Sequence, residues 1–402
     1  MRDPAFLRFW VAQAVSLIGS QVSRLALPLT VVLTLGGGVA ALSLVNALLS
    51  VPFLLFGLVV GVWVDRWPRV RVLVTADVVR GLTLASIPVA AALGILTLAW
   101  LCVVAFVVGT LTVFFDVAQQ AILPSLVSRG RLPEANGKLS LTDSLSRFAG
   151  PSVGGVLVQV LSAPAAVLAD ALSFLASAAL LRRLPTAGPP KPTRRAGLRA
   201  ELVEGIRFVV GNRQVRTLAV AGSVLNLVDS AFTVLMLVFL ADGLGLGAAT
   251  IGLGFAIGSA GGLAAATLTP RVWARLGGPG TMTLALSAIL AGRLAVGAMP
   301  QGAPAAALAI LGLALAMTGM GSVAFNVVQV SIRQQVTPDD LLGRVNAAVR
   351  TVLWGVIPLG ALLGGLLGSA LPLRTAVLVT AAALVLPVLL LLPLRTGADA
   401  TP

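Results

Sequence analysis

The chain is poor in the residues that most enzymes and metalloproteins depend on. It contains no histidine, its only cysteine is Cys102, and charged residues make up 10% of its 402 positions. Soluble domains are about 25% charged. Without histidine there is no histidine proton relay and no His-ligated metal, and one cysteine allows neither an internal disulfide nor a cysteine-rich metal site. A Walker-type glycine-lysine loop is also missing. We therefore expect no metal, no cofactor and no enzymatic activity.

Apolar residues dominate what remains. The chain is 58% hydrophobic, and a soluble core has no room for so much apolar surface, so the solvent must be lipid. Runs of about 20 apolar residues recur along the whole chain, each long enough to cross a bilayer. They do not alternate polar with apolar residues as barrel strands do, so we expect an all-α membrane protein. The twelve predicted spans are roughly 9–33, 40–64, 71–92, 98–121, 137–160, 164–184, 214–240, 248–271, 280–299, 303–330, 342–368 and 373–394.

The two halves of the chain repeat each other at a constant offset of 210 residues. Phe115, Gln119, Asn136 and the pair Gly154-Gly155 recur as Phe325, Gln329, Asn346 and Gly364-Gly365. A duplicated membrane unit predicts two pseudo-symmetric six-helix bundles with a pathway between them, the plan of a secondary transporter. The predicted domains are 1–184, a Pro-rich basic linker with an amphipathic helix at 185–213, and 214–402.

Positive charge lies almost entirely on one side of the predicted spans. Of the 28 Lys and Arg residues, 22 fall in segments on the side of both termini, five within spans, and one, Arg374, on the other side. Positive residues stay cytosolic, so both termini and the linker are expected to face the cytosol of a cell (plasma or inner) membrane. The first span is expected to be a retained helix. The amphipathic stretch 198–211 is expected along the inner membrane surface, near lipid.

Three motifs carry a family resemblance. The loop after the second span reads GVWVDRWPRVR (61–71), the fifth span contains AGPSVGGVL (149–157), and LPEANG occupies 132–137. The first resembles the 2–3 loop signature of the major facilitator superfamily. The second resembles the motif of its drug:proton antiporters, and the set looks closest to the macrolide and siderophore exporter-like branch. Span four departs from many antiporters: its charged residue is Asp116, where they carry a buried arginine.

The loop between spans two and three is the predicted cytosolic gate. Asp65 ends a helix and can accept hydrogen bonds from the N-terminus of a neighbouring helix, which the resemblance implies is span eleven. Arg66, Arg69 and Arg71 are expected to reach Asp116. Ordinary anchoring of the inner face by arginine is the alternative.

The fifth span carries a face of small residues. Gly150, Gly154 and Gly155 permit close helix approach, and Pro151 removes a backbone donor and bends the helix. Tight packing explains these residues, and the resemblance adds a flexing contact between rocking halves.

Polar stripes mark the first helix of each three-helix unit, on one face of the helix in each case. One such stripe would usually indicate helix–helix hydrogen bonding. Four stripes in equivalent helices favour a shared, water-filled substrate cavity. The candidate cavity residues are Gln13, Ser16, Ser20 and Arg24 in span one, Thr112 and Gln119 in span four, Ser223, Asn226 and Asp229 in span seven, and Asn326 and Gln329 in span ten.

Charges inside the spans are costly and mark either function or a buried partner. Asp77 and Arg80, three residues apart, are expected to form a structural pair. Arg24 and Asp229 lie at similar depths and are expected to face each other as a gate or substrate contact. Separating them would favour protonation of Asp229 and couple proton entry to conformation. The alternative is that each is satisfied elsewhere.

These features together predict a secondary active transporter. We expect proton-coupled efflux of amphipathic small molecules such as drugs, macrolide-like compounds or siderophores, by alternating access. Its partners would be substrate, protons and membrane lipids, without nucleic acid, and the carrier is expected to be a monomer. An uptake or lipid-translocating carrier of the same fold is the main alternative, and a transport-inactive sensor or scaffold is a further one.

Overall fold

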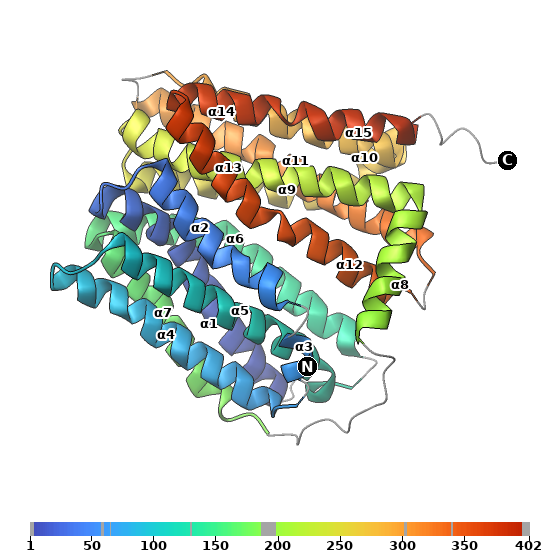
Figure 1. Ribbon diagram of the computed structural model, residues 1–402, viewed down its shortest axis with the longest axis horizontal. Helices are drawn as coiled ribbons and strands as arrows, with labels where there is room; N and C mark the ends of the chain where they lie inside the picture. Colours follow the sequence, from blue (N-terminus) through green and yellow to red (C-terminus); the bar gives the residue numbers. More distant parts are fainter. Residues whose placement is uncertain are drawn as a thin grey trace. The chain divides into compact units, whose positions relative to one another are not determined.

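The computed structural model describes residues 4–57, 60–64, 66–128, 131–185, 198–300, 304–338 and 341–395. The regular structure in these residues is helical (Figure 1). The chain divides into two compact units, the first formed by residues 1–192 with 246–256, and the second by 193–245 with 257–402. An all-α fold was predicted from the absence of alternating polarity, and the helices confirm it.

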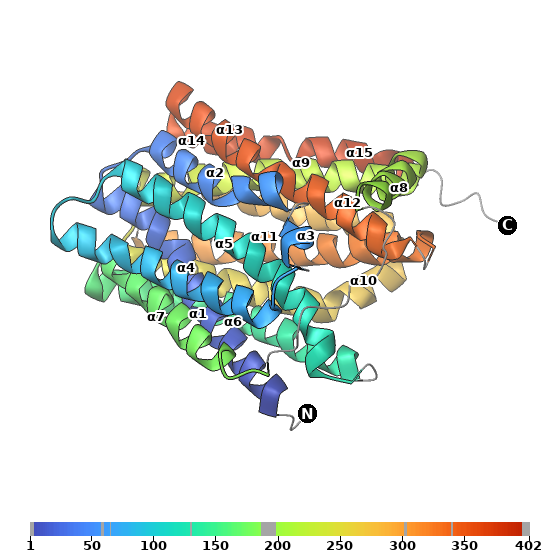
Figure 2. The ribbon, with the colours of Figure 1, turned by 60° about the horizontal axis from the view of Figure 1, so that its bottom comes forward.

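In the described residues, the first unit is built from seven helices, a π-helical turn and the start of α10 (Ala248–Gly297). Within it α1 packs against α6 and α7, α4 against α5 and α7, and α2 against α5; Figures 1 and 2 show α4 and α7 side by side from two directions. Its elements are α1 (Pro4–Leu29), η1 (Thr30–Thr34), α2 (Val39–Phe56), α3 (Val60–Val64), α4 (Arg69–Ala92), α5 (Leu98–Leu126), α6 (Leu132–Leu161) and α7 (Ala163–Leu181).

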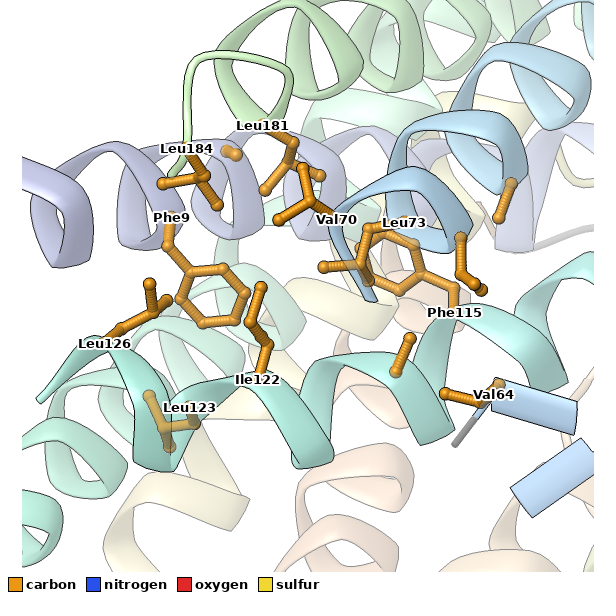
Figure 3. Close-up of a cluster of buried hydrophobic side chains, with 14 of the residues drawn as sticks. Phe9, Val64, Val70, Leu73, Phe115, Ile122, Leu123, Leu126, Leu181 and Leu184 are labelled. Atoms are coloured by element: carbon orange, nitrogen blue, oxygen red, sulfur yellow. The ribbon is translucent and has the colours of Figure 1, made fainter. Parts of the chain in front are cut away.

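A hydrophobic cluster fixes the cytosolic half of this unit, as judged from the predicted orientation. Phe9 of α1 is fully buried and lies with Leu73 of α4, Phe115 and Ile122 of α5 and Leu181 of α7 (Figure 3). Side chains this closely packed hold four helices at one level, because protein interiors leave few voids. The charged groups described below therefore sit on a rigid frame.

The second unit is arranged around α9. Helices α13, α14 and α15 pack against α9, and α8 packs against α12. Its elements are α8 (Leu198–Gly211), α9 (Arg213–Val238), η3 (Phe239–Gly243), the larger part of α10 (Ala248–Gly297), α11 (Pro304–Val336), α12 (Leu342–Gly355), α13 (Ile357–Ala370), α14 (Leu373–Ala382) and α15 (Val385–Arg395).

Side-chain caps mark where several helices begin. Thr97 accepts a hydrogen bond from the Trp100 backbone N–H at 3.2 Å, and Asn212 accepts one from Val215 at 3.0 Å. Ser162 does the same for Ala165 at the start of α7, at 3.4 Å. Each cap satisfies a backbone donor that the first turn leaves without a partner. The positions where these helices begin are therefore determined by the capping residues in the adjoining loops.

All twelve predicted spans coincide with helical segments: two of them share one helix, and 40–64, 342–368 and 373–394 are each divided between two helices. Ten helices among the described residues are long and apolar enough to cross a membrane. One of them, α10, covers both 248–271 and 280–299, with a break at Gly277, where φ is 67° and ψ is 176°. Helix α6 covers the predicted span 137–160. Because a residue with positive φ interrupts an α-helix, α10 consists of two helical segments that meet at Gly277. A count of twelve membrane spans is consistent with this arrangement.

Helix boundaries follow the sequence repeat. The first residues of α6 and α7 lie 210 residues before the first residues of α12 and α14, respectively. The last residue of α5 lies 210 residues before the last residue of α11. The π-helical turns η1 and η3 occupy equivalent places at the ends of α1 and α9, offset by 209 residues. The repeat found in a few motifs therefore extends to element boundaries.

The predicted amphipathic helix exists as α8, and its described contacts are with protein. A Cβ on Gly205 would meet the Arg344 backbone carbon at 2.7 Å, and Glu204 pairs with Arg344 at 2.6 Å. Helix α8 thus packs on the beginning of α12 (Figure 1). The Pro-rich part of the linker, 186–197, lies outside the described residues.

We expect Gly364→Ala to lower the free energy of unfolding by about 1–3 kcal/mol, the usual cost of overpacking. A Cβ there would meet the Ala231 carbonyl oxygen at 2.7 Å and its Cα at 3.0 Å, both backbone atoms that cannot rotate away. Denaturation of the purified protein in mixed micelles, followed by circular dichroism, measures this.

The matched control is Gly137→Ala, because nothing lies within 4 Å of a Cβ at that position. It should be neutral or slightly stabilising, since alanine favours helix over glycine by about 1 kcal/mol. Equal losses in the two variants would contradict the close approach of α13 and α9.

Candidate functional site

Among the residues whose side chains are described, each unit buries one arginine in its third predicted span. Arg80 lies in α4 of the first unit and is 4% exposed, and Arg293 lies in α10 of the second and is fully buried. A charge at mid-membrane costs about 3 kcal/mol or more unless it is paired. The groups that neutralise the two arginines are therefore the starting point for a site.

In the second unit, Arg293 pairs with Asp229 of α9. The Nη2 atom of Arg293 donates to Oδ1 of Asp229, and the guanidinium carbon lies 4.6 Å from the centre of the Phe232 ring. The aspartate side chain is 51% exposed whereas the arginine side chain is 1% exposed. Among described residues, Nε and Nη1 of Arg293 find no hydrogen-bond partner. One end of the pair is accessible, and the other is fixed in the helix packing.

The sequence analysis did not assign Arg293 to Asp229. Both residues lie within predicted spans, but they are 64 positions apart on helices whose pairing the sequence does not specify. Arg24, the predicted partner, is an exposed residue of α1 in the other unit. Its contact with Asp229 stays a prediction.

In the first unit, Arg80 lies at the centre of a larger cluster. It pairs with Asp77, as predicted from their spacing, and its Nη1 donates to Thr112 of α5 at 3.3 Å. Its guanidinium carbon lies 4.3 Å from the Phe115 ring centre and 4.1 Å from that of Phe174. Stacking on two aromatic faces stabilises a desolvated guanidinium. Thr112, predicted to line a cavity, thus binds the arginine.

A second buried carboxylate, Asp170 of α7, belongs to the same region. Its Oδ1 accepts hydrogen bonds from Ser20 of α1 at 3.3 Å and from Ser173 at 3.2 Å. Asp170 is 2% exposed. Ser20 was predicted to line a cavity, and the structure gives its hydroxyl this neighbour in α7. Asp170 itself lies within the predicted span 164–184.

The other predicted cavity residues differ in their surroundings. Gln13 and Ser16 are buried in α1, Gln119 is partly buried in α5, and Asn326 is exposed on α11. The hydroxyl of Ser223 donates to the carbonyl of Ala219 in its own helix at 2.8 Å. Because the Ser223 hydroxyl already donates to a carbonyl within α9, it has no hydrogen left to donate to a substrate or to water.

Two predicted cavity residues form hydrogen bonds between helices. Asn226 donates to the Leu353 carbonyl at 2.8 Å, and Gln329 donates to the Leu218 carbonyl at 2.9 Å. Ser230, one turn beyond Asn226, donates to the Ile357 carbonyl at 2.8 Å. Leu353 and Ile357 flank the break between α12 and α13. These side chains therefore form hydrogen bonds between helices, which is the usual role of a single polar stripe.

The predicted gate loop is described in part, since Asp65 lies outside the described residues. Arg69 donates to the Ala121 carbonyl at 2.6 Å, near the end of α5. Arg66 and Arg71 are exposed, and Asp116 is partly buried in α5. The predicted contacts of the three arginines with Asp116 stay a prediction. Arg69 nevertheless ties the loop to the helix that carries Asp116.

Two tryptophans of this loop form an exposed aromatic surface. Trp63 and Trp67 stack on Phe114, with ring centres 6.0 and 6.5 Å away. Together with Arg66 they line a shallow hollow of about 320 Å³. Aromatic residues that are partly exposed are typical of membrane interfaces.

The glycines of α6 allow close approach within the first unit. Gly150 packs against the side chain of Gln21, and a Cβ on Gly154 would meet the Cα of Val22 at 3.2 Å. A Cβ on Gly155 would meet the Cα of Gly252 at 2.8 Å. Pro151 lies in α6, and its side chain is outside the described set. The predicted small face is therefore used in packing.

Comparison with known families gives one match that covers most of the chain. The family described as Major Facilitator Superfamily matches residues 9–357. This agrees with the resemblance of the 61–71 loop and the 149–157 motif.

Curated relatives include efflux proteins. The multidrug efflux pump Tap of Mycobacterium tuberculosis is 33% identical over 230 residues, covering 54% of this chain and 53% of that protein. Macrolide efflux protein A of Streptococcus pyogenes is 26% identical over 220 residues, 54% of each. The matches span about half the length of these relatives. The enterobactin exporter EntS of Shigella boydii is 30% identical over 410 residues, covering 97% of this chain and 92% of EntS.

A solved structure gives the same fold. A bacterial homologue of the iron transporter ferroportin, in its inward-facing state, superposes with a TM-score of 0.78 at 17% identity, covering 97% of this chain and 98% of the homologue. Similarity at this level of identity establishes the fold. The exporter-like branch inferred from the motifs is confirmed by the relatives.

The Arg293–Asp229 pair should respond asymmetrically to substitution. Asp229→Ala leaves a buried guanidinium without its counter-charge and should lower stability by about 3 kcal/mol. Arg293→Met leaves a half-exposed carboxylate that water can solvate, with an expected loss below about 1 kcal/mol. Thermal unfolding in detergent, followed by tryptophan fluorescence, compares the two.

The double variant Asp229→Ala/Arg293→Met serves as the control and should recover most of the stability that Asp229→Ala loses, since no unpaired charge remains. If Arg293→Met proved as damaging as Asp229→Ala, the arginine would matter through packing alone.

Proposed function

Since the chain belongs to the Major Facilitator Superfamily, we propose that this multi-pass membrane transporter exports amphipathic small molecules in exchange for protons. The two six-helix bundles alternate access to a central site, so that substrate meets one side of the membrane at a time. A proton gradient supplies the energy, because the sequence has no Walker-type nucleotide loop. The transporter lies in the cell membrane with both termini in the cytosol, as the distribution of positive charge favours.

The observation that carries this proposal is the Asp229–Arg293 pair. The carboxylate is half-exposed and is bound to a fully buried guanidinium, so it is an acid within a predicted span with one part of its surface uncovered by its own unit. A carboxylate that loses its neighbouring cation in a medium of low dielectric binds a proton more readily. Separation of the pair as the helices move therefore links protonation to conformation.

The cytosolic gate is formed by the loop between α2 and α4. Arg69 holds this loop to the Ala121 carbonyl of α5, and we assign Asp65, Arg66, Arg71 and Asp116 to the same gate. Opening the cytosolic side breaks these contacts. The small face of α6 at Gly150, Pro151, Gly154 and Gly155 permits the helix to shift against its neighbours without side-chain collisions.

Substrate contacts come from scattered polar groups and not from a dense ion site. Gln119 in the first unit and Asn326 in the second are only partly buried or exposed, and Arg24 is exposed on α1. Scattered hydrogen-bonding groups on apolar walls suit large amphipathic molecules. The relatives named above, a multidrug efflux pump, a macrolide efflux protein and an enterobactin exporter, carry substrates of that class.

We expect Asp229→Asn to reduce proton-driven export by about tenfold or more, because an amide keeps a hydrogen-bond acceptor for Arg293 but cannot take up a proton. The purified protein is reconstituted in liposomes, and transport of ethidium, erythromycin and enterobactin is followed with an imposed pH gradient. Substrate counterflow without a gradient should persist, since it needs no net proton movement.

The control is Asp242→Asn, the same substitution at an exposed position beyond α9 in η3. It should leave gradient-driven transport unchanged. Full gradient-driven export by Asp229→Asn would remove the coupling role of this residue. Substrate accumulation driven by a pH gradient of the opposite direction would instead identify an uptake carrier.

A further inference from the structure

Among the residues whose side chains are described, the buried cluster around Arg80 in the first unit contains more acid than base. Asp77 is 0% exposed, Asp170 is 2% exposed, and Arg80, the guanidinium between them, is 4% exposed. The charge of Arg80 acts on both carboxylates. If both were ionised, this apolar interior would hold a net charge of minus one, which is strongly disfavoured in a medium of low dielectric.

No other described cation is recorded as acting on these carboxylates. On α1, Arg8 and Arg24 are exposed, and on α4, Arg71 is exposed while Arg69 binds the end of α5. The remaining charged groups on packed elements stand at helix ends or on α5 and α6: Asp116, Glu134, Lys138, Asp143, Arg182 and Arg183, with the Arg147 side chain outside the described set. Arg80 is thus the cation that both carboxylates share.

One buried carboxylate oxygen of the cluster lacks a geometrically good donor. Among the described residues, Oδ2 of Asp77 has no hydrogen-bond partner. The hydroxyls of Ser177 and Ser23 lie beside Asp77 and Asp170, respectively, and can donate to them, but serine carries no charge. A proton on one carboxyl group therefore removes the excess negative charge that the neutral serines leave in place.

We propose that the first unit holds one exchangeable proton, shared by Asp170 and Asp77 beside Arg80, and that the transport cycle loads and unloads it. Asp170 is the residue that carries the proton, because Asp77 contacts Arg80 directly whereas Asp170 receives hydrogen bonds from neutral serines. The carboxylate of Asp170 takes one proton from water on the outer side and becomes a neutral acid. It returns that proton to water on the cytosolic side, and no electrons move.

This site deepens the proposed proton-coupled export and rests on it for its role in transport. It is separate from Asp229, whose partner Arg293 balances it one to one. The helices that meet at Asp170 are α1, α4 and α7: α1 contributes Ser20, and α4 contributes Arg80. Gain or loss of the proton therefore acts on the packing of three helices at once.

Infrared spectroscopy of the purified full chain tests the proton directly. A protonated carboxylic acid shows a C=O stretch that a carboxylate lacks. At neutral pH, the amplitude of this C=O band should follow the number of buried acids in the cluster that exceed the number of bases. The wild type should show the band, and Asp170→Asn and Asp77→Asn should each lack it. Arg80→Gln should double it. Asp229→Asn, in the balanced pair, is the control and should leave the band unchanged.

Transport of ethidium in liposomes tests the role of the proton. Asp170→Asn should lose gradient-driven export, by about tenfold or more, and keep gradient-independent counterflow. Asp170→Glu, which keeps the acid, should recover part of the gradient dependence. If Asp170→Asn does not fold, Asp77→Asn replaces it, because it also removes the acid excess.

The outcomes separate this inference from the proposed function. A wild type without gradient-dependent transport contradicts the proposed function, and the infrared series still decides whether the proton is present. A wild type that is gradient-dependent while Asp170→Asn is equally so overturns the exchangeable proton and leaves export intact. A C=O band that survives both Asp170→Asn and Asp77→Asn overturns the site itself.

Discussion

The protein depends on one constraint: a charge inside the bilayer must find its counter-charge within the protein. Lipid offers neither water nor ions, so each buried arginine determines which acids and aromatic rings lie around it. Arg293 is held by Asp229 and Phe232, and Arg80 by Asp77, Thr112, Phe115 and Phe174. The apolar cluster around Phe9 and Phe115 and these few charges together fix the relative positions of the helices within a unit.

The duplicated units solve this problem in different ways. In each, the arginine lies on the third membrane-crossing helix, and Arg80 and Arg293 differ by one helical turn once the 210-residue offset is applied. Their acids come from different elements. Asp229 aligns with Gly19, which packs against Ser173 and Asp170, and Asp170 aligns with the buried Thr380. The described pair in the second unit is balanced and half-exposed at its acid, whereas the described cluster in the first unit holds two buried acids and one buried arginine. Divergence after duplication has thus given the two units different electrostatics.

Much of the fold was predictable from the sequence because the signal is simple. Long apolar runs predicted the spans, and the repeat at Phe115 and Phe325 predicted the duplicated helix boundaries. Pairing of Asp77 with Arg80 followed from helical spacing. The partner of Asp229 did not follow, because helix neighbours far apart in sequence are set by packing. Asn226 and Gln329 were predicted to face a cavity, yet they donate to backbone carbonyls. A polar face on a helix does not reveal whether it meets water or a broken neighbouring helix.

Helix α9 connects the accessible acid to the most irregular span of the second unit. Asn226 and Ser230 donate to carbonyls on both sides of the break between α12 and α13, where Pro358 removes a backbone donor. Asp229 lies between them in sequence and holds Arg293 of α10. A rotation or shift of α9 that frees Asp229 from Arg293 therefore changes the hydrogen bonds at that break. Since α8 packs on α12 through Gly205 and Glu204, the same movement reaches the linker helix. A movement of α9 at Asp229 is thus linked mechanically to the segment that begins span eleven.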